Sequence, residues 1–463
     1  MSIAAQIGPQ PSLRDATSLL GEIRSGTTTA RDATLAALNR IKELDGGLKA
    51  FITVSAASAM ETATRLDAEG PQDRALFGLT LAVKDLLDTA GIRTTHGSLA
   101  YADHVPQTDD IVVARARRAG AVVVGKTNTP EFGFGAVCTN ALCGPTANPL
   151  DPTLTSGGSS GGSAVAVATG MAAAALGTDF GGSVRMPAAF CGVVGFRPTP
   201  GRLPTLGRSL AWEASSTTGL ITRSVRDARL LFEALEGPDP GDFASLRAWP
   251  SDRTAPERPI IAATKDFKFA PMSAVVSAAF EEAVGAIESE LGALTRAQPD
   301  CTGARESFAT LRAAHIRHNL SGMREKLGDK LSPTVRWNID RGDGLTAADY
   351  LAAEAKRGEI THRFVDFFRS FDLIISPSAA LLPRPHDAGE VDNIDGKPLQ
   401  SLIEYFSVSL VISLVGCPAI SIPFWPSGAR LPIGVQVVAA PGADYPLLSM
   451  AERLERVLAA STR

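Results

Sequence analysis

The chain has 463 residues, of which 44% are apolar, and its formal net charge at pH 7 is -4. This length allows either one large hydrophobic core or two or three ordinary domains. The small net charge, without a long run of like charges, argues against a nucleic-acid groove or an anionic membrane surface as the partner. We therefore expect a small-molecule substrate, with no nucleic acid and no membrane.

The cellular location and the cofactors are also constrained by the sequence. Residues 1–15 lack the basic flank and the apolar segment of a secretory signal peptide. The five cysteines form no C-x-x-C pair, which is typical of reduced thiols in a cytoplasmic protein. His315 and His318 are close in sequence but belong to no ligand motif, so we expect surface or packing roles for them. The sequence predicts a cytoplasmic protein with no metal and no cofactor.

Helices and strands alternate along the first half of the chain. Ser12 and Thr28 are the expected N-caps of two amphipathic helices. The elements that follow are a helix over residues 56–70, a strand over 79–85, a helix over 109–119, a strand over 121–127, a helix over 161–176 and a short strand near 193–196. Such alternation predicts an α/β sheet.

The second half continues this pattern. The expected elements are a helix over 225–235, a strand over 259–264, a helix over 273–291, a mostly helical region over 304–371, strands at 373–377, 419–424 and 434–438, and a closing helix over 447–459. Within the helical region, the polar interval 332–346 is expected to form a loop. Because the sequence contains no repeat and no linker-like composition, one large domain is the simplest prediction.

Two serine-containing glycine loops, GGSSGGS at 157–163 and DFGGS at 179–183, flank an apolar run at 164–176. GGSSG matches the G-x-S-x-G elbow of α/β-hydrolases, with Ser159 as nucleophile, but a turn-rich segment stands where the elbow needs a strand. A phosphate-binding loop would need the G-K-[ST] of a P-loop. An N-cap at Ser159 or Ser160 is also possible, but it does not explain the second loop.

A serine nucleophile needs a base, and no histidine lies in or beside either loop. A lysine is therefore the candidate, and no lysine follows a serine at Ser-x-x-Lys spacing as in penicillin-binding enzymes. Lys84 ends an apolar strand, where burial could lower its pKa from about 10.4 toward about 7.5. An ordinary ion pair of Lys84 with Asp85 or Asp88 is the alternative interpretation.

Several spaced motifs resemble those of the amidase signature family. They are LAVKDLLD around Lys84, TTHGS at 94–98, GKTNTPEFGFG from 125, GPTANP before the first serine loop, TSGGSSGGSAVAVA, and LGTDFGGSVRMP. The resemblance is strong over about residues 10–235 and weaker near the C-terminus. It implies the amidase signature fold, a large, mixed, twisted β-sheet covered on both faces by helices. It also implies one domain, 1–463, with N-terminal helices over about 1–70, a signature core over 71–235, and further strands and a helical pocket wall over 236–463.

The resemblance also implies the site residues. Ser183 would be the nucleophile, Ser159 the bridging serine after a cis Gly158–Ser159 bond, and Lys84 the base of a Ser-Ser-Lys triad. The oxyanion hole would consist of the backbone amides of Phe180, Gly181, Gly182 and Ser183. Gly133 falls where the family lines the acyl pocket with a main-chain carbonyl, and Ala141 is a further expected substrate contact.

The substrate prediction depends on departures from the family pattern. Phe180 stands where the family more often has Ile or Thr, and Cys143 stands where an aromatic residue is common. The expected entrance residues are mainly apolar, namely Phe134, Ala141, Leu203, Trp212 and Leu382. We therefore expect a hydrolase of apolar or aryl amides or of carbamates (urethanes), able to act on esters and to form a homodimer. The alternatives are the glutaminase subunit of a tRNA-dependent amidotransferase, and a non-catalytic binding protein on the same fold.

Overall fold

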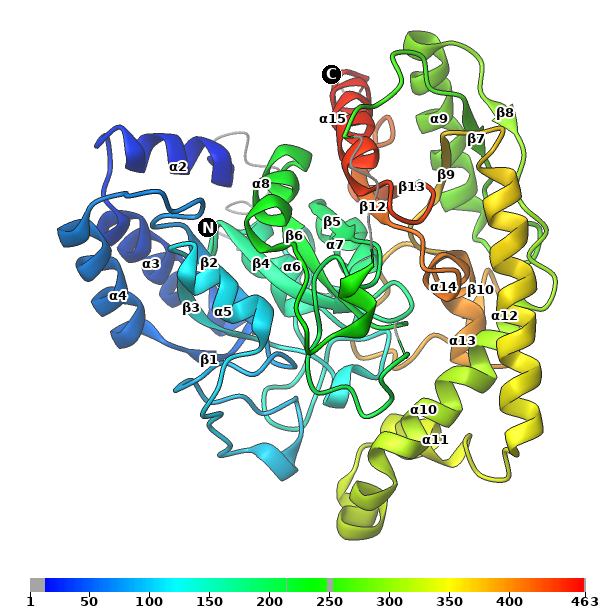
Figure 1. Ribbon diagram of the computed structural model, residues 1–463, viewed down its shortest axis with the longest axis horizontal. Helices are drawn as coiled ribbons and strands as arrows, with labels where there is room; N and C mark the ends of the chain where they lie inside the picture. Colours follow the sequence, from blue (N-terminus) through cyan, green and yellow to red (C-terminus); the bar gives the residue numbers. More distant parts are fainter. Residues whose placement is uncertain (1–12, 214, 248–252, 462–463) are drawn as a thin grey trace.

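A mixed β-sheet of eleven strands runs through the centre of the part of the chain that is described (Figure 1). The computed structural model describes residues 13–213, 215–247 and 253–461. In spatial order the strands are β1 (Phe51–Val54), β3 (Val122–Thr127), β2 (Thr80–Lys84), β4 (Ala174–Asp179), β6 (Thr217–Thr222), β5 (Val194–Arg197), β12 (Ala419–Phe424), β13 (Ile433–Val438), β9 (Leu373–Pro377), β7 (Ile261–Ala263) and β8 (Thr295–Arg296). The pairs within β3–β2–β4 and within β9–β7–β8 are parallel, whereas the pairs from β4 to β9 are antiparallel.

Helices cover both faces of this sheet (Figure 1). They are α2 (Ala16–Arg24), α3 (Ala30–Leu48), α4 (Ala56–Glu69), α5 (Ile111–Arg118), α6 (Gly161–Ala168), α7 (Arg185–Cys191), α8 (Val225–Leu235), α9 (Ala274–Leu291), α10 (Ala304–Leu327), α11 (Pro333–Asp340), α12 (Ala347–Phe367), α13 (Leu402–Tyr405), α14 (Ser407–Leu414) and α15 (Asp444–Ala460). A small ribbon of β10 (Asn393–Ile394) and β11 (Lys397–Pro398) lies outside the sheet. Because β5 from the first half pairs with β12 from the second, both halves share one sheet and form a single domain, which confirms the predicted fold class.

The predicted helix over 161–176 is wrong in its second half. Helix α6 ends at Ala168, and Gly170, with φ +74°, lies in the turn that follows. The next residues enter β4, which pairs with β2 on one side and β6 on the other. A strand between two others under covering helices is apolar on both sides, so hydrophobic periodicity could not distinguish it from a buried helix.

Three further predictions differ from the structure. Thr29, not Thr28, caps α3 through a hydrogen bond from Asp32 N, whereas Ser12 lies outside the described residues and Asp15 caps α2. The polar interval 332–346 begins with α11 rather than a loop, because Ser332 caps this helix and Pro333 occupies its first turn. The segment that forms β6 and the short helices α7, α13 and α14 were not predicted at all.

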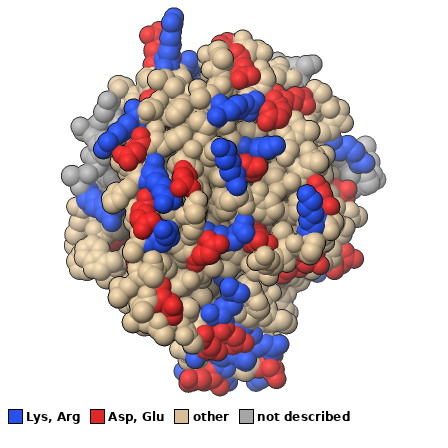
Figure 2. All heavy atoms as spheres, turned by 90° about the vertical axis from the view of Figure 1, so that its right-hand side faces the viewer, with Lys and Arg blue, Asp and Glu red and all other residues tan. Residues whose placement is uncertain are grey.

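Positive and negative side chains alternate on the face that carries α12, without a field of one sign (Figure 2). Pairs such as Arg357 with Glu354, at 2.6 Å, and Arg363 with Asp300, at 3.1 Å, account for part of this mixture. The face that carries α12 thus offers no extended basic surface for a polyanion.

Within the described residues, no helix is both long and apolar enough to cross a bilayer.

Two helical glycines provide a test of how tightly the first serine loop is packed. A Cβ on Gly162 in α6 would lie 2.5 Å from Asn128 N and would also overlap Ala50 O, and both are backbone atoms that cannot swing away. A Cβ on the exposed Gly285 in α9 would meet nothing within 4 Å. We expect Gly162→Ala to destabilise the protein by about 1–3 kcal/mol or more, and Gly285→Ala to stabilise it by about 0.5–1 kcal/mol. Thermal unfolding of both variants checks this, and a Gly162→Ala protein as stable as the wild type would contradict the packing.

Candidate active site

Lys84 reaches the centre of the site because β2 and β4 are parallel neighbours. The register that aligns Val83 with Leu176 brings the carboxyl ends of both strands to the same edge of the sheet. There the Lys84 Nζ lies 2.9 Å from Thr178 Oγ1 and 3.4 Å from Thr178 O. The side chain is completely buried.

The Lys84 amine contacts both central serines of the first loop. Its Nζ lies 2.7 Å from Ser159 Oγ and 2.9 Å from Ser160 Oγ. Burial lowers the pKa of Lys84 from 10.5 to about 7, and this effect outweighs the opposing attraction of Cys138 and Asp179. With a pKa this low, part of the Lys84 amine is neutral near pH 7, and a neutral amine can accept a proton. Among the described residues, no ion pair joins Lys84 to Asp85 or Asp88, the alternative partners considered from the sequence.

The first serine loop does not act as a simple helix cap. Ser160 occupies the N-cap position of α6, but its side chain makes no capping hydrogen bond. Its hydroxyl faces Lys84 instead, and its backbone N–H donates to Ser183 O at 3.1 Å, which joins the two serine loops. The Gly158–Ser159 peptide bond is cis.

The buried side chain of Asp179 fixes the backbone of the second serine loop through hydrogen bonds. Its carboxylate accepts hydrogen bonds from Gly182 N at 2.8 Å and Val184 N at 3.1 Å, and it pairs with Arg185 at 2.9 Å. Burial alone would raise the pKa of Asp179, but the Arg185 and Arg197 guanidinium groups hold it well below its usual range. The carboxylate therefore stays ionised and fixes the backbone that follows it.

The backbone amides of this loop divide into two groups. Gly182 N–H is already used by Asp179, so its predicted part in an oxyanion hole remains a prediction that this structure does not favour. Within the described chain, the N–H groups of Phe180, Gly181 and Ser183 have no hydrogen-bond partner. These three amides, on either side of the occupied Gly182, are the ones left available to an anion at this loop.

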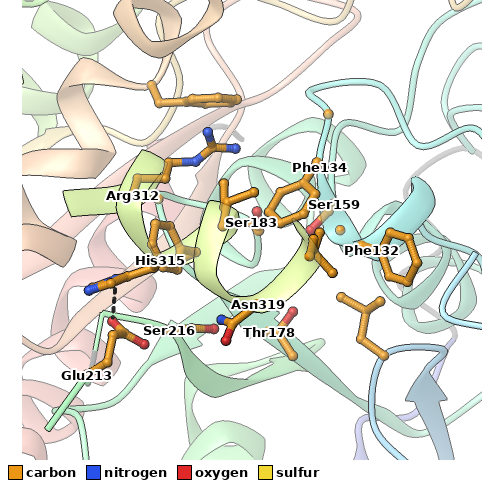
Figure 3. A pocket seen from close by; sticks show the side chains of 18 of the residues that line it. Phe132, Phe134, Ser159, Thr178, Ser183, Glu213, Ser216, Arg312, His315 and Asn319 are labelled. Carbon is orange, nitrogen blue, oxygen red and sulfur yellow. Dashed lines mark ion pairs between the residues drawn. The ribbon is translucent and has the colours of Figure 1, made fainter. Parts of the chain in front are cut away.

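A cavity of about 300 Å³ opens at these loops (Figure 3). Its polar lining residues are Ser159, Thr178, Ser183, Glu213, Ser216, Arg312, His315 and Asn319, and its apolar lining includes Leu86, Phe132, Phe134, Phe180, Phe308, Ile316, Leu320 and Phe406. The two serines thus face the same space, although no hydrogen bond joins their hydroxyl groups in the described structure. Gly133 also lines it, and a Cβ at that position would lie 2.7 Å from Leu86 Cδ1.

The predicted entrance residues differ in where the structure places them. Phe134 lines the cavity, whereas Ala141, Leu203, Trp212 and Leu382 are not among the described lining residues. Leu203 is fully buried in the main core, and Trp212 is 74% exposed and stacks on Phe243. Motif spacing indicates candidate reacting groups, but it does not show which distant side chains lie near them in the fold.

The residues that sequence reasoning missed come mainly from α10. Phe308, Arg312, His315 and Asn319 recur at spacings of four, three and four residues and form the helical face that closes the cavity. His315 Nδ1 lies 3.6 Å from Glu213 Oε1 in this wall. His315 therefore packs within the protein, as expected from the sequence, but it also lines the cavity. The sequence shows that this face of α10 is partly polar and partly apolar, but it does not show that the face lines the cavity.

One group of potential metal ligands lies elsewhere in the described residues. Asp88, His96 and His104 each offer a ligand atom, and these atoms lie within 4.8 Å of one another. His96 Nε2 lies 3.5 Å from Asp88 Oδ1, the separation of an ordinary Asp–His ion pair, and His104 is exposed. None of the three lines the cavity.

Comparison with known sequences gives matches along nearly the whole chain. The amidase family profile matches residues 32–448. A glutamyl-tRNA(Gln) amidotransferase subunit of Alkaliphilus metalliredigens is 32% identical over 466 residues, which cover 93% of each chain. The corresponding subunit from Thermus thermophilus is 35% identical over 473 residues, 95% of this chain and 97% of the relative.

Solved structures agree with this assignment. A crystal structure of an amidase superposes with a TM-score of 0.86 at 30% identity, covering 96% of this chain and all of the other. A bacterial aryl acylamidase of the amidase signature family superposes with a TM-score of 0.85 at 25% identity, covering 96% of both chains. The chain therefore belongs to the amidase signature family and is an enzyme that acts on carbon–nitrogen bonds.

Proposed function

We propose that the chain hydrolyses carboxamides through an acyl-enzyme on Ser183, with Ser159 as the proton relay and Lys84 as the base. The observation that carries this proposal is the 2.7 Å contact between the buried Lys84 Nζ and Ser159 Oγ. A lysine can act as a base at neutral pH only if its pKa is strongly lowered, and burial lowers that of Lys84 to about 7. A non-catalytic binding protein would have no use for an amine kept neutral in this way.

The reaction follows from these positions. Neutral Lys84 accepts the proton of Ser159, Ser159 accepts that of Ser183, and the Ser183 oxygen forms a bond with the substrate carbonyl carbon. The relayed proton then goes to the leaving nitrogen as the carbon–nitrogen bond breaks. Water attacks the acyl-enzyme along the same relay and releases the acid and the free serine.

The free amides of Phe180, Gly181 and Ser183 are the proposed donors to the tetrahedral oxyanion. A donor held in place before the reaction needs no reorganisation when the negative charge develops, and each is typically worth about 3–4 kcal/mol of barrier. Asp179 supports this arrangement because its carboxylate is occupied by Gly182 N, Val184 N and Arg185, and so holds the loop without facing the oxyanion.

The aromatic lining of the cavity supports an apolar or aryl group in the substrate. Phe180 and Phe308 pack edge to face with ring centroids 5.5 Å apart, and both line the cavity. An aryl or alkyl group on either side of the scissile bond would contact these rings. Carbamates (urethanes) and esters form the same kind of tetrahedral intermediate and are further candidate substrates.

A second candidate is the glutaminase subunit of a tRNA-dependent amidotransferase, which would act within a complex of several subunits. The curated sequence relatives favour this alternative over the aryl-amide hydrolase predicted first from the sequence. Charged groups in the cavity, Arg312 and Glu213, also fit an amino acid better than a purely apolar ligand. Both candidates use the same reacting groups and differ in the acyl group that they accept.

The triad makes a graded prediction. We expect Ser183→Ala to lower kcat/KM on an anilide by about 10³-fold or more, because the nucleophile is lost. Lys84→Ala should be nearly as damaging and Ser159→Ala less so, since water can replace a relay more easily than a nucleophile. Ser216→Ala, at another serine of the same cavity, is the matched control and should stay within about tenfold of the wild type. Undiminished turnover by Ser183→Ala would disprove the proposal.

The base makes a prediction about pH. Protonated Lys84 cannot accept a proton, so kcat/KM should fall about tenfold per unit as the pH drops below about 7 and should level off above it. His315 also lines the cavity and could titrate, although burial lowers its pKa below the usual value. In His315→Gln the inflection should therefore stay near pH 7, with circular dichroism confirming that both proteins remain folded. An inflection that disappears in this variant would assign it to the histidine instead.

The two candidate functions separate in one assay. The purified chain alone is tested on anilides, carbamates, primary amides and glutamine. An independent hydrolase should turn over an anilide or a carbamate without any partner. Glutamine hydrolysis that requires co-purifying subunits, with no anilide turnover, would favour the glutaminase subunit of an amidotransferase as the function.

A further inference from the structure

We propose that Arg312 forms a carboxylate-binding subsite in the catalytic cavity, so that preferred substrates carry a carboxylate near the scissile amide. This inference rests on the proposed amide hydrolysis and narrows its substrate class. It differs from the neutral substrate expected from the apolar residues of the sequence.

Arg312 is a buried cation without a counter-charge. Its side chain lies on α10 and is only 8% exposed. One of its nitrogens, Nη1, donates to the neutral Asn338 Oδ1, and its Cζ lies 5.4 Å from the centre of the Phe134 ring. Among the described residues, no carboxylate lies within ion-pair distance of the Arg312 guanidinium. Burial, with repulsion from Arg341, lowers the pKa of Arg312 to about 10, so the group is still charged at neutral pH.

Other buried arginines of this protein are paired. Arg185 and Arg197 both contact Asp179, at 2.9 and 3.5 Å, and Arg202 pairs with Glu236. A buried charge without a partner is costly, and proteins normally pair it or use it to hold a ligand. Arg312 is thus missing a partner that the other buried arginines have.

The acidic residue of the same cavity does not supply that partner. Glu213 faces His315 at 3.6 Å and Arg208 at 3.7 Å, and its Oε1 accepts a hydrogen bond from Ser215 N at 2.6 Å. No direct interaction joins Glu213 to Arg312 in the described structure. Glu213 is therefore committed to its own neighbours.

The position of Arg312 places the missing anion on the substrate. Its side chain enters the same cavity as Ser183, as Figure 3 shows, and the guanidinium keeps N–H donors that Asn338 does not use. The planar fork of a guanidinium matches the two oxygens of a carboxylate. A cavity of about 300 Å³ lies at the small end of ligand pockets, which span roughly 300–1,000 Å³. The carboxylate must then lie within a few bonds of the amide.

The test compares matched ligands that differ in one charge. On the acyl side the pair is succinanilate and butyranilide, and on the leaving side it is 4-acetamidobenzoate and 4-methylacetanilide. Binding is measured by calorimetry on Ser183→Ala, where no turnover occurs, and kcat/KM is measured on the wild type. We expect at least one carboxylate ligand to bind at least tenfold more tightly than its neutral partner, with a matching preference in kcat/KM.

Variants of α10 assign this preference to a residue. Arg312→Met keeps an unbranched side chain and removes the guanidinium charge, and it should reduce the charged-to-neutral ratio to near one. Arg312→Lys should retain part of the preference. Arg317→Met changes an exposed arginine of the same helix that pairs with Asp343, and it should leave the ratio unchanged.

The outcomes separate the two proposals. Equal binding within both ligand pairs, or a preference that survives in Arg312→Met, would overturn the carboxylate subsite even if anilides are hydrolysed. A preference that depends on Arg312 in the Ser183→Ala background, with no anilide or glutamine turnover by the wild type, would keep the subsite and contradict the hydrolase.

Discussion

The buried contact between Asp179 and Arg185 supports the rest of the site. Arg185 also donates to Ser409 O at 3.1 Å, Gln436 Oε1 at 2.6 Å and Ser413 Oγ at 2.8 Å. The loop that carries Ser183, the proposed nucleophile, is thereby tied to α14 and β13, more than 200 residues later in the chain. Both ionic side chains are completely buried, and such a pair is tolerated only when nearly every donor and acceptor is matched. The polar network therefore makes α14 and β13 part of the support of the site.

Asp179 and Lys84 are both buried, but burial has a different outcome for the charge of each side chain. Asp179 remains charged because the Arg185 and Arg197 guanidinium groups lie beside it, whereas burial lowers the pKa of Lys84, whose nearest partners are hydroxyl groups rather than carboxylates. A carboxylate beside Lys84 would stabilise its protonated form and prevent it from acting as a base. Both ionisable groups lie at the end of neighbouring strands, and the side chains around each decide its charge.

Much of the candidate site was predictable from the sequence because its proposed reacting groups lie within short, distinctive segments. The apolar strand that ends at Lys84 and the two serine loops were recognisable, and β2 and β4 bring them together as parallel strands do. The use of Gly182 N–H by Asp179 was not predictable, because it depends on the conformation of one loop. Arg312 was missed because a buried arginine and an exposed one look the same on an amphipathic helix. Ala141 and Trp212 show the reverse case, since apolar character alone did not bring them to the cavity.

The wall that α10 provides has an evolutionary consequence. The groups proposed to break the bond come from residues 84–183, whereas the face that closes over the substrate belongs to a helix more than 100 residues further along the chain. Substitutions on that face alter what the cavity accepts without disturbing the strands that hold the lysine and the serines. The substrate range can therefore change through a few turns of one helix, while the strands and loops that carry the candidate reacting groups stay as they are.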